Sequence, residues 1–212
     1  MSRKVYLDNN ATTPLHPEVL NEIMPFLKED FGNPSSIHQF GRKVRVKIDE
    51  AREKVAYAVG ADPSEIVFTA GGSESDNFAI KSYVWANGIN GGLPGNQTGG
   101  HIITSLIEHH AVLDTCRYLE KNGYRVTYLP VDEYGMVNPS DVKNAIQGDT
   151  ILISIHHSNN EVGTIEPVEE ISKIARSKGI ALHTDAVQSL GKVPLNVNEL
   201  GADLMSISAH KL

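Results

Sequence analysis

The chain of 212 residues has one cysteine, a shortage of basic residues and no long apolar run. The single Cys116 cannot form an internal disulfide, which argues against a small secreted scaffold. No run approaches the roughly 18 apolar residues of a membrane helix, and the first residues lack the apolar stretch of a signal peptide. Lys and Arg number 19 against 26 Asp and Glu, and the net charge of −7 argues against a nucleic-acid partner. These absences predict a soluble, cytoplasmic protein with no membrane or nucleic-acid partner.

The residues that are present have a globular composition. Hydrophobic residues make up 40% of the chain, which excludes intrinsic disorder, and a chain of this length can bury a sizeable core. Short β-branched runs predict strands at residues 65–69, 101–104, 125–129, 150–155, 179–183 and 203–207. Helical spacing of apolar residues predicts helices at 42–59, 74–86, 111–121, 139–146 and 167–177. This alternation predicts an α/β fold with a mostly parallel sheet flanked by helices.

Polar residues follow five of the predicted strands, at the point where each strand ends. In parallel sheets, ligands bind beyond the carboxyl ends of the strands, so five loops are expected to meet at one edge. These loops are residues 71–74 (GGSE), 108–110 (EHH), 159–161 (NNE), 185–188 (DAVQ) and 208–211 (SAHK). The pattern predicts a ligand site built from these loops.

Each of these residues, taken alone, has an ordinary structural interpretation as well. Gly72 and Ser73 open a helix, whose N-terminus either binds an anion or is simply a capped turn. Lys211 either forms a Schiff base with a carbonyl or is a solvated charge. Asp185 either pairs with a protonated pyridine nitrogen or caps a helix. His109 can stack on a flat ring or transfer a proton.

Other polar residues admit further alternatives. His110, His156 and His157 raise the possibility of a metal site, but the spacing matches no known zinc pattern. Cys116 lies among apolar residues, which favours a packed thiol over a nucleophile. Residues 88–100 contain six glycines and a proline, which predicts a mobile surface loop.

The ordered set of motifs is far more specific than any one of them. It resembles the cysteine desulfurases of the NifS/IscS type over essentially the whole chain, with residues 88–100 as a local insertion. The motifs are residues 6–13 (YLDNNATT), 31–36 (FGNPSS), 65–69 (EIVFT), 72–75 (GSES), 108–109 (EH), 159–163 (NNEVG), 185–192 (DAVQSLGK) and 208–211 (SAHK).

This resemblance implies a fold-type I pyridoxal 5′-phosphate enzyme of the class V aminotransferase group. The implied reaction converts L-cysteine to L-alanine and transfers the sulfur to an enzyme cysteine as a persulfide, for iron–sulfur clusters or other sulfur-containing cofactors. Lys211 would hold the cofactor covalently and act as a base, Asp185 would pair with its pyridine nitrogen, and His109 would stack on its ring and assist proton transfer. The remaining cofactor-binding residues would be Gly72, Ser73, Asn160, Gln188, Ser208 and His210. Asn10, Ala11 and Asn160 would contact the substrate.

The resemblance also implies an organisation and a set of partners. Residues 1–15 would be an N-terminal arm, residues 16–212 a truncated large cofactor-binding domain, and the C-terminal small domain would be absent. The loop with the acceptor cysteine would then be missing, so the chain is expected to be inactive alone. The implied partners are a second copy in a homodimer and a sulfur-acceptor or iron–sulfur scaffold protein. The alternatives are a non-catalytic or split-enzyme half that binds the cofactor, and another fold-type I lyase of the selenocysteine lyase or kynureninase type.

Overall fold

The computed structural model describes residues 3–88 and 99–212, and these form two compact units, Met1–Phe68 and Thr69–Leu212. Residues 89–98 of the predicted glycine-rich loop lie outside the described residues. The predicted division into an arm of residues 1–15 and a large domain of residues 16–212 stays a prediction.

The first unit contains two helices and one short 3₁₀ turn. Helix α1 spans Pro17–Lys28, helix α2 spans Gln39–Val59, and the turn η1 spans Pro63–Glu65. Pro25 is expected to break or kink the helix around it. The break is wrong, because α1 continues through Pro25 to Lys28, and the kink stays a prediction. Helix α2 begins three residues before the predicted start and ends at Gly60, whose φ of 75° is the left-handed conformation common at helix ends.

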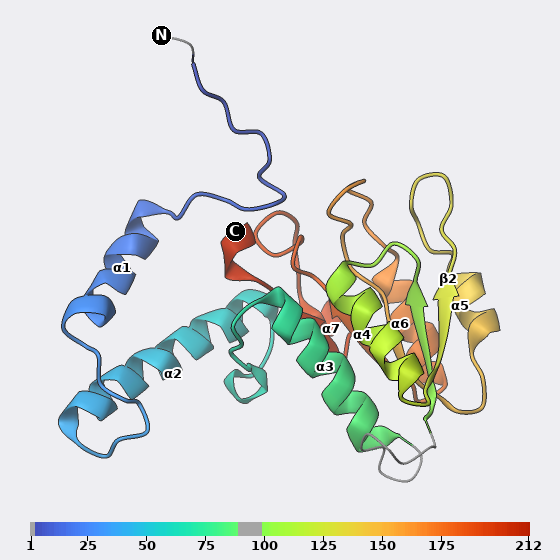
Figure 1. The fold of residues 1–212 in the computed structure, drawn as a ribbon, viewed down its shortest axis with the longest axis horizontal. Helices are drawn as coiled ribbons and strands as arrows, with labels where there is room; N and C mark the ends of the chain where they lie inside the picture. The colour runs from blue at the N-terminus through green and yellow to red at the C-terminus, as the bar shows by residue number, and fades with distance from the viewer. Residues whose placement is uncertain (1–2, 89–98) are drawn as a thin grey trace. The chain divides into compact units, whose positions relative to one another are not determined.

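The second unit is built around a five-stranded sheet whose strands all pair in parallel (Figure 1). The strand order is β2-β1-β3-β4-β5, so the direction of winding reverses between β1 and β3. The bounds are β1 His101–Ser105, β2 Arg125–Leu129, β3 Thr150–Ser154, β4 Ala181–Asp185 and β5 Leu204–Ser206. The predicted parallel sheet is confirmed.

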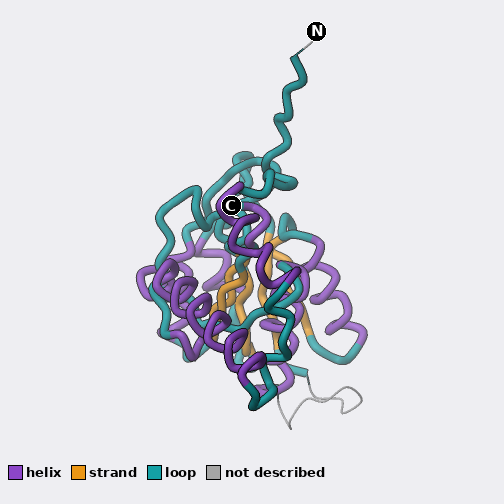
Figure 2. Tube along the Cα trace, turned by 90° about the vertical axis from the view of Figure 1, so that its left-hand side faces the viewer, coloured by secondary structure: helices purple, strands orange, loops and turns teal. Residues whose placement is uncertain are grey.

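Helices cover both faces of this sheet, which gives three layers; Figure 2 shows the strands in orange between purple helices. One face carries α3 (Gly72–Asn87) and α4 (His110–Lys121). The other carries α5 (Pro139–Ala145), α6 (Val168–Ser177) and α7 (Val197–Leu200). The short turn η2 (Ala209–Lys211) follows β5. None of the helices in the described part combines the length and apolar character needed to cross a membrane.

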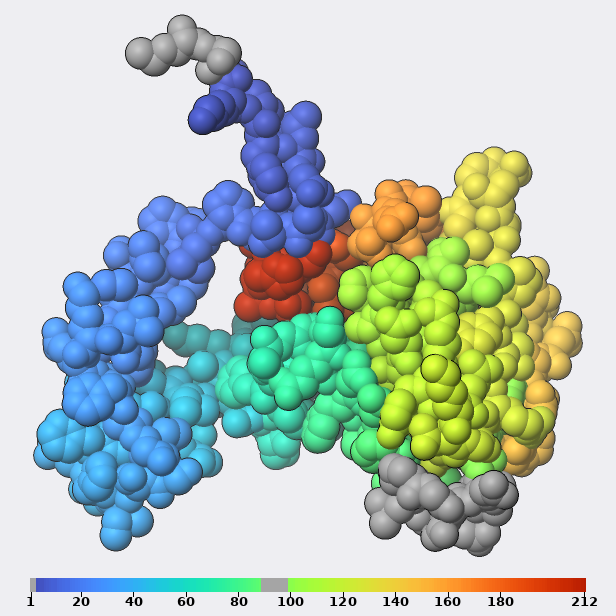
Figure 3. All heavy atoms as spheres, in the orientation of Figure 1, coloured from blue at the N-terminus to red at the C-terminus, as the bar shows by residue number. Residues whose placement is uncertain are grey.

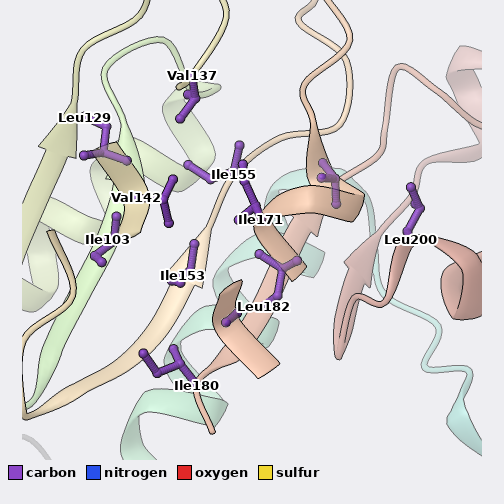
Figure 4. Close-up of a cluster of buried hydrophobic side chains, with 12 residues drawn as sticks. Ile103, Leu129, Val137, Val142, Ile153, Ile155, Ile171, Ile180, Leu182 and Leu200 are labelled. Atoms are coloured by element: carbon purple, nitrogen blue, oxygen red, sulfur yellow. The ribbon is translucent and has the colours of Figure 1, made fainter. Parts of the chain in front are cut away.

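Alternating side chains of the strands form a separate core on each face of the sheet. Ile102 packs with α3 and α4, whereas the next residue, Ile103, packs with α5 and α6, as the two-residue period of a strand requires. Leu152 and Ile153 divide in the same way. Figure 4 shows the second cluster, with Ile153 among its members. Cys116 is fully buried in the first cluster, so it is a packed thiol as its apolar neighbours predict.

The predicted strand at residues 65–69 is wrong. Ile66 is extended, but residues 66–69 belong to no strand in the described part of the chain. The Arg52 guanidinium donates a hydrogen bond to the carbonyl of Ile66 and lies 4.9 Å from the ring centre of Phe68. Val67 and Phe68 are exposed, so the apolar run that suggested a buried strand does not mark one.

Candidate functional site

The carboxyl ends of the parallel strands carry the polar residues that the sequence places there. Asp185 is the last residue of β4, and Ser208 follows β5 by two residues. Glu108 and His109 lie in the loop between β1 and α4, and His156 follows the end of β3. Since all five strands are parallel, these groups share one edge of the sheet, as predicted.

The start of α3 lies against the loops that follow β4 and β5. A Cβ atom added to Gly72 would be 3.0 Å from Cγ2 of Val187 and 3.6 Å from Cβ of Ser208, so a larger side chain would crowd this junction. Figure 3 shows the C-terminal segment in red next to the blue-green start of α3. Gly71 supplies no side-chain cap to the helix. The first amides of α3, including that of Ser73, therefore point out of the helix without an intrahelical acceptor, which suits an anion.

Asp185 is a buried carboxylate close to two histidines. It is 8% exposed, and its Oδ1 accepts a hydrogen bond of 2.9 Å from the amide of Val187. Burial raises the pKa of Asp185, while the Val187 hydrogen bond and the nearby His109 and His156 oppose that rise. His109 is exposed at the N-cap of α4, where its Nδ1 accepts a hydrogen bond of 3.1 Å from Ala111. The structure therefore brings Asp185 and His109 within electrostatic reach of each other.

Lys211 lies beside the turn that carries Gln188. The ammonium of Lys192 donates a hydrogen bond of 2.7 Å to Oε1 of Gln188. Partial burial lowers the pKa of Lys192, and the nearby charge of Lys211 lowers it further. A Cβ atom added to Gly191 would be 2.9 Å from Cδ2 of Leu212, so the segment after β5 lies against this turn.

The other predicted residues occupy more varied positions. Asn160 follows Asn159, whose side chain accepts from the amides of residues 161 and 162 and donates to the carbonyl of Ile107 at 3.0 Å. His210 is exposed within η2. Asn10 and Ala11 are exposed in a turn of the first unit, and their contact with substrate stays a prediction.

The second unit also contains buried polar groups that were not predicted from the sequence. His183 on β4 is fully buried, with Nδ1 2.9 Å from Oγ of Ser154 and Nε2 3.1 Å from Oγ of Ser206. Burial lowers its pKa to about 4, so the imidazole is neutral. Asp76 of α3 is 1% exposed, and its Oδ1 lies 3.6 Å from Nε2 of His183. For His183, the signal in the sequence is a polar side chain that follows an apolar run. Asp76 lies in a polar stretch and gives no such signal, and in neither case does the sequence reveal the partner.

Two of the three histidines that suggested a metal site, His156 and His157, have hydrogen-bond partners in the protein. Nδ1 of His157 lies 2.7 Å from Oγ of Ser189, and Nδ1 of His156 lies 3.0 Å from the Glu108 carboxylate. Within residues 3–88 and 99–212, no three His, Cys, Asp or Glu side chains are grouped to hold a metal ion.

Comparisons with known proteins agree with this architecture. The chain is 59% identical over 211 residues to the cysteine desulfurase IscS of Dictyoglomus turgidum, covering all of this chain and 52% of that protein. It is 53% identical to the IscS of Methanosarcina thermophila, covering 99% of this chain and 50% of that one. The chain thus spans about half the length of the curated relatives it matches.

Solved structures show the same similarity. A structure described as SspA in complex with cysteine superimposes with a TM-score of 0.91 at 43% identity, covering 97% of this chain and 57% of that one. A structure described as a NifS-like protein superimposes with a TM-score of 0.90 at 42% identity, covering 99% of this chain and 56% of that one. The family model for class-V aminotransferases matches residues 5–212. The chain belongs to the class-V aminotransferase family.

Proposed function

We propose that this chain is the cofactor-binding part of a cysteine desulfurase that uses pyridoxal 5′-phosphate. The observation that carries the proposal is the meeting of three segments at one sheet edge: the uncapped start of α3 at Gly72, the buried Asp185, and the loop of Ser208. A phosphate and a pyridinium nitrogen need groups of these kinds. Membership of the class-V family and the similarity to IscS proteins support the assignment.

The chemistry of the donor set fits this cofactor. The phosphate would lie at the amides of Gly72 and Ser73, a place that a Cβ on Gly72 would crowd. Oδ1 of Asp185 accepts the hydrogen bond from the Val187 amide, and the other carboxylate oxygen would pair with the ring nitrogen. The other groups toward the cofactor would be His109 over the ring, Asn160 and Gln188 near the ring oxygen, Ser208 and His210 at the phosphate, and Lys211 as the covalent attachment.

The residues of this chain would then perform distinct tasks. When bound, the cofactor supplies an electron sink for the substrate carbon. The Asp185 carboxylate would keep the ring nitrogen protonated, and low exposure strengthens that interaction because little water screens it. The Lys211 amine would take the proton from the substrate Cα, and His109 would hold or return a proton.

The substrate and partners belong to the same proposal. The solved relative described as a complex with cysteine supports L-cysteine as the substrate. Asn10, Ala11 and Asn160 would contact this substrate. The products would be L-alanine and a persulfide on a cysteine thiol, and the sulfur would pass to an acceptor or iron–sulfur scaffold protein. The enzyme would act as a homodimer.

Titration of the chain with pyridoxal 5′-phosphate tests the cofactor assignment. Wild type and Lys173→Ala, which changes an exposed lysine on α6, should both develop visible absorbance that borohydride bleaches. Lys211→Ala should not. L-cysteine should change the visible absorbance more than L-kynurenine does. A visible band that survives in Lys211→Ala would refute the lysine assignment, and a response to L-kynurenine alone would favour the other lyase class.

A further inference from the structure

Three buried side chains from two loops meet next to the candidate site: Glu108 from the loop between β1 and α4, and His156 and Glu166 from the loop between β3 and α6. We refer to these three residues as the carboxylate–histidine clamp. They are 5%, 3% and 3% exposed. Buried ionisable groups are costly unless they are paired, so this cluster needs a structural or functional reason.

One carboxylate oxygen of Glu108 accepts three hydrogen bonds. Its Oε1 accepts from Oγ of Ser105 at 2.7 Å, from the amide of His156 at 3.0 Å and from Nδ1 of His156 at 3.0 Å. The first donor is the last residue of β1, and the other two belong to the segment after β3. The carboxylate is therefore fixed to the ends of two neighbouring strands.

The far side of the His156 ring faces the second carboxylate. Its Nε2 lies 3.6 Å from Oε1 of Glu166, whose other oxygen accepts a hydrogen bond of 2.8 Å from the amide of Val137. Burial alone would lower the pKa of His156, but the two carboxylates outweigh it and the pKa is raised. An imidazolium carries a proton on both nitrogens, so it suits a place between two carboxylates.

The clamp is joined to two residues of the candidate site through the backbone. His109 follows Glu108 directly, and a trans peptide leaves only a few rotatable bonds between their side chains. On the other side, the amide of His157 donates a hydrogen bond of 2.8 Å to the carbonyl of Asp185. A movement of His156 would therefore disturb the backbone that carries both His109 and Asp185.

We propose that His156 is a positioning residue: held between Glu108 and Glu166, it fixes Glu108 and thereby orients the next residue, His109, beside Asp185. The inference rests on the proposed function for the role of the His109 ring over a cofactor. The orientation itself concerns residues of this chain alone, so it can be measured without cofactor. The side-chain amide of asparagine places a donor where Nδ1 of histidine lies, whereas leucine fills similar space and donates nothing.

The test uses the 212-residue chain labelled with ¹⁵N-histidine, and NMR signals of the His109 ring are recorded without cofactor. His156→Leu should shift the His109 ring signals toward those of a freely rotating histidine, and His156→Asn should restore most of the wild-type position. Glu166→Gln, a milder change that preserves the hydrogen-bonding shape, should produce a smaller shift in the same direction. Glu170→Gln alters an exposed carboxylate at the start of the neighbouring helix and is the matched control.

A second readout follows when pyridoxal 5′-phosphate is added. His156→Leu should retain visible absorbance but lose the visible circular dichroism that an oriented ring environment induces, with recovery in His156→Asn. Unchanged His109 signals in His156→Leu and Glu166→Gln, with only a lower unfolding temperature, would overturn the proposal and leave the clamp a purely structural feature. Failure of wild type to bind the cofactor would instead refute the proposed function, while the cofactor-free NMR comparison would still decide the role of His156.

Discussion

Replacing Asp76 by asparagine should stabilise the chain, and increasingly so as the pH rises. Asp76 on α3 is 1% exposed, and its Oδ1 has no hydrogen-bond partner among the described residues. The imidazole nearest to it, that of His183, is neutral because burial holds its pKa at about 4, so it offers Asp76 no charge to pair with. Burial, with a smaller contribution from the Asp185 charge, raises the pKa of Asp76 to about 8.

The sign of the pH effect follows from proton binding. At pH values between the usual carboxyl pKa of 3.8 and the pKa of about 8 in the folded chain, Asp76 has lost its proton in the unfolded chain but keeps it in the folded chain. The folded state binds more protons, so this group makes the free energy of unfolding fall as the pH rises through that window. The slope is about 1.4 kcal/mol per pH unit, so Asp76→Asn should gain roughly 3 kcal/mol on wild type between pH 5 and pH 7.

Urea unfolding of both proteins at pH 5, 6 and 7 measures this difference. Titrating groups that do not interact with Asp76 affect both proteins in nearly the same way, so their contributions to the unfolding free energy largely cancel in the difference. Asp114→Asn is the control, because that exposed carboxylate on α4 pairs with Arg117 at the surface and should change the unfolding free energy by about 0.5 kcal/mol or less at each pH. If the difference in unfolding free energy between Asp76→Asn and wild type stays constant from pH 5 to pH 7, or becomes smaller, Asp76 is ionised in the folded chain and the reasoning is refuted.

Three further outcomes follow from the same packing and burial. Ile153→Ala removes a fully buried side chain from β3 and should cost about 3–4 kcal/mol in urea unfolding, whereas exposed Val162→Ala should cost little. Burial raises the pKa of Cys116 to about 12, so a thiol reagent at pH 8 should label it only after denaturation; rapid labelling of the native chain would contradict its burial. Gly201→Ala should destabilise by about 1 kcal/mol or more, because φ is +69° and the new Cβ would lie 2.7 Å from Oγ of Ser172; an unchanged melting temperature would count against that clash.

The fold was largely predictable because its central parallel strands are covered on both faces. Such strands are short and nearly all apolar, and they are separated by longer segments with helical spacing, so residues 150–155 were recognisable without any partner in view. The same criterion failed at residues 65–69. An apolar run does not report whether a neighbouring strand is available, and here the carbonyl of Ile66 accepts from Arg52 instead.

The edge of the site was predictable for a related reason. Once the strands are parallel, every residue just after a strand lies at the same edge, so Asp185 and Ser208 are brought there by topology rather than by any local signal. The way in which the edge is held together could not be predicted, because the partners are far apart in the sequence. Glu108 bonds His156 across 48 residues, and Ser75 bonds Ser206 across 131 residues.

The buried polar groups beneath this edge break the rule that made the sheet predictable. A core of apolar strands needs no Asp76, His183 or clamp, and each of these groups costs stability when it is buried. Natural sequences depart from local consistency mainly at functional sites. The departures here lie close together: Glu108 and His156 act electrostatically on Asp185, and the charge of Asp185 in turn raises the pKa of Asp76. A stability gain from Asp76→Asn would therefore measure the unfolding free energy that this electrostatic environment costs the folded chain beside the proposed site.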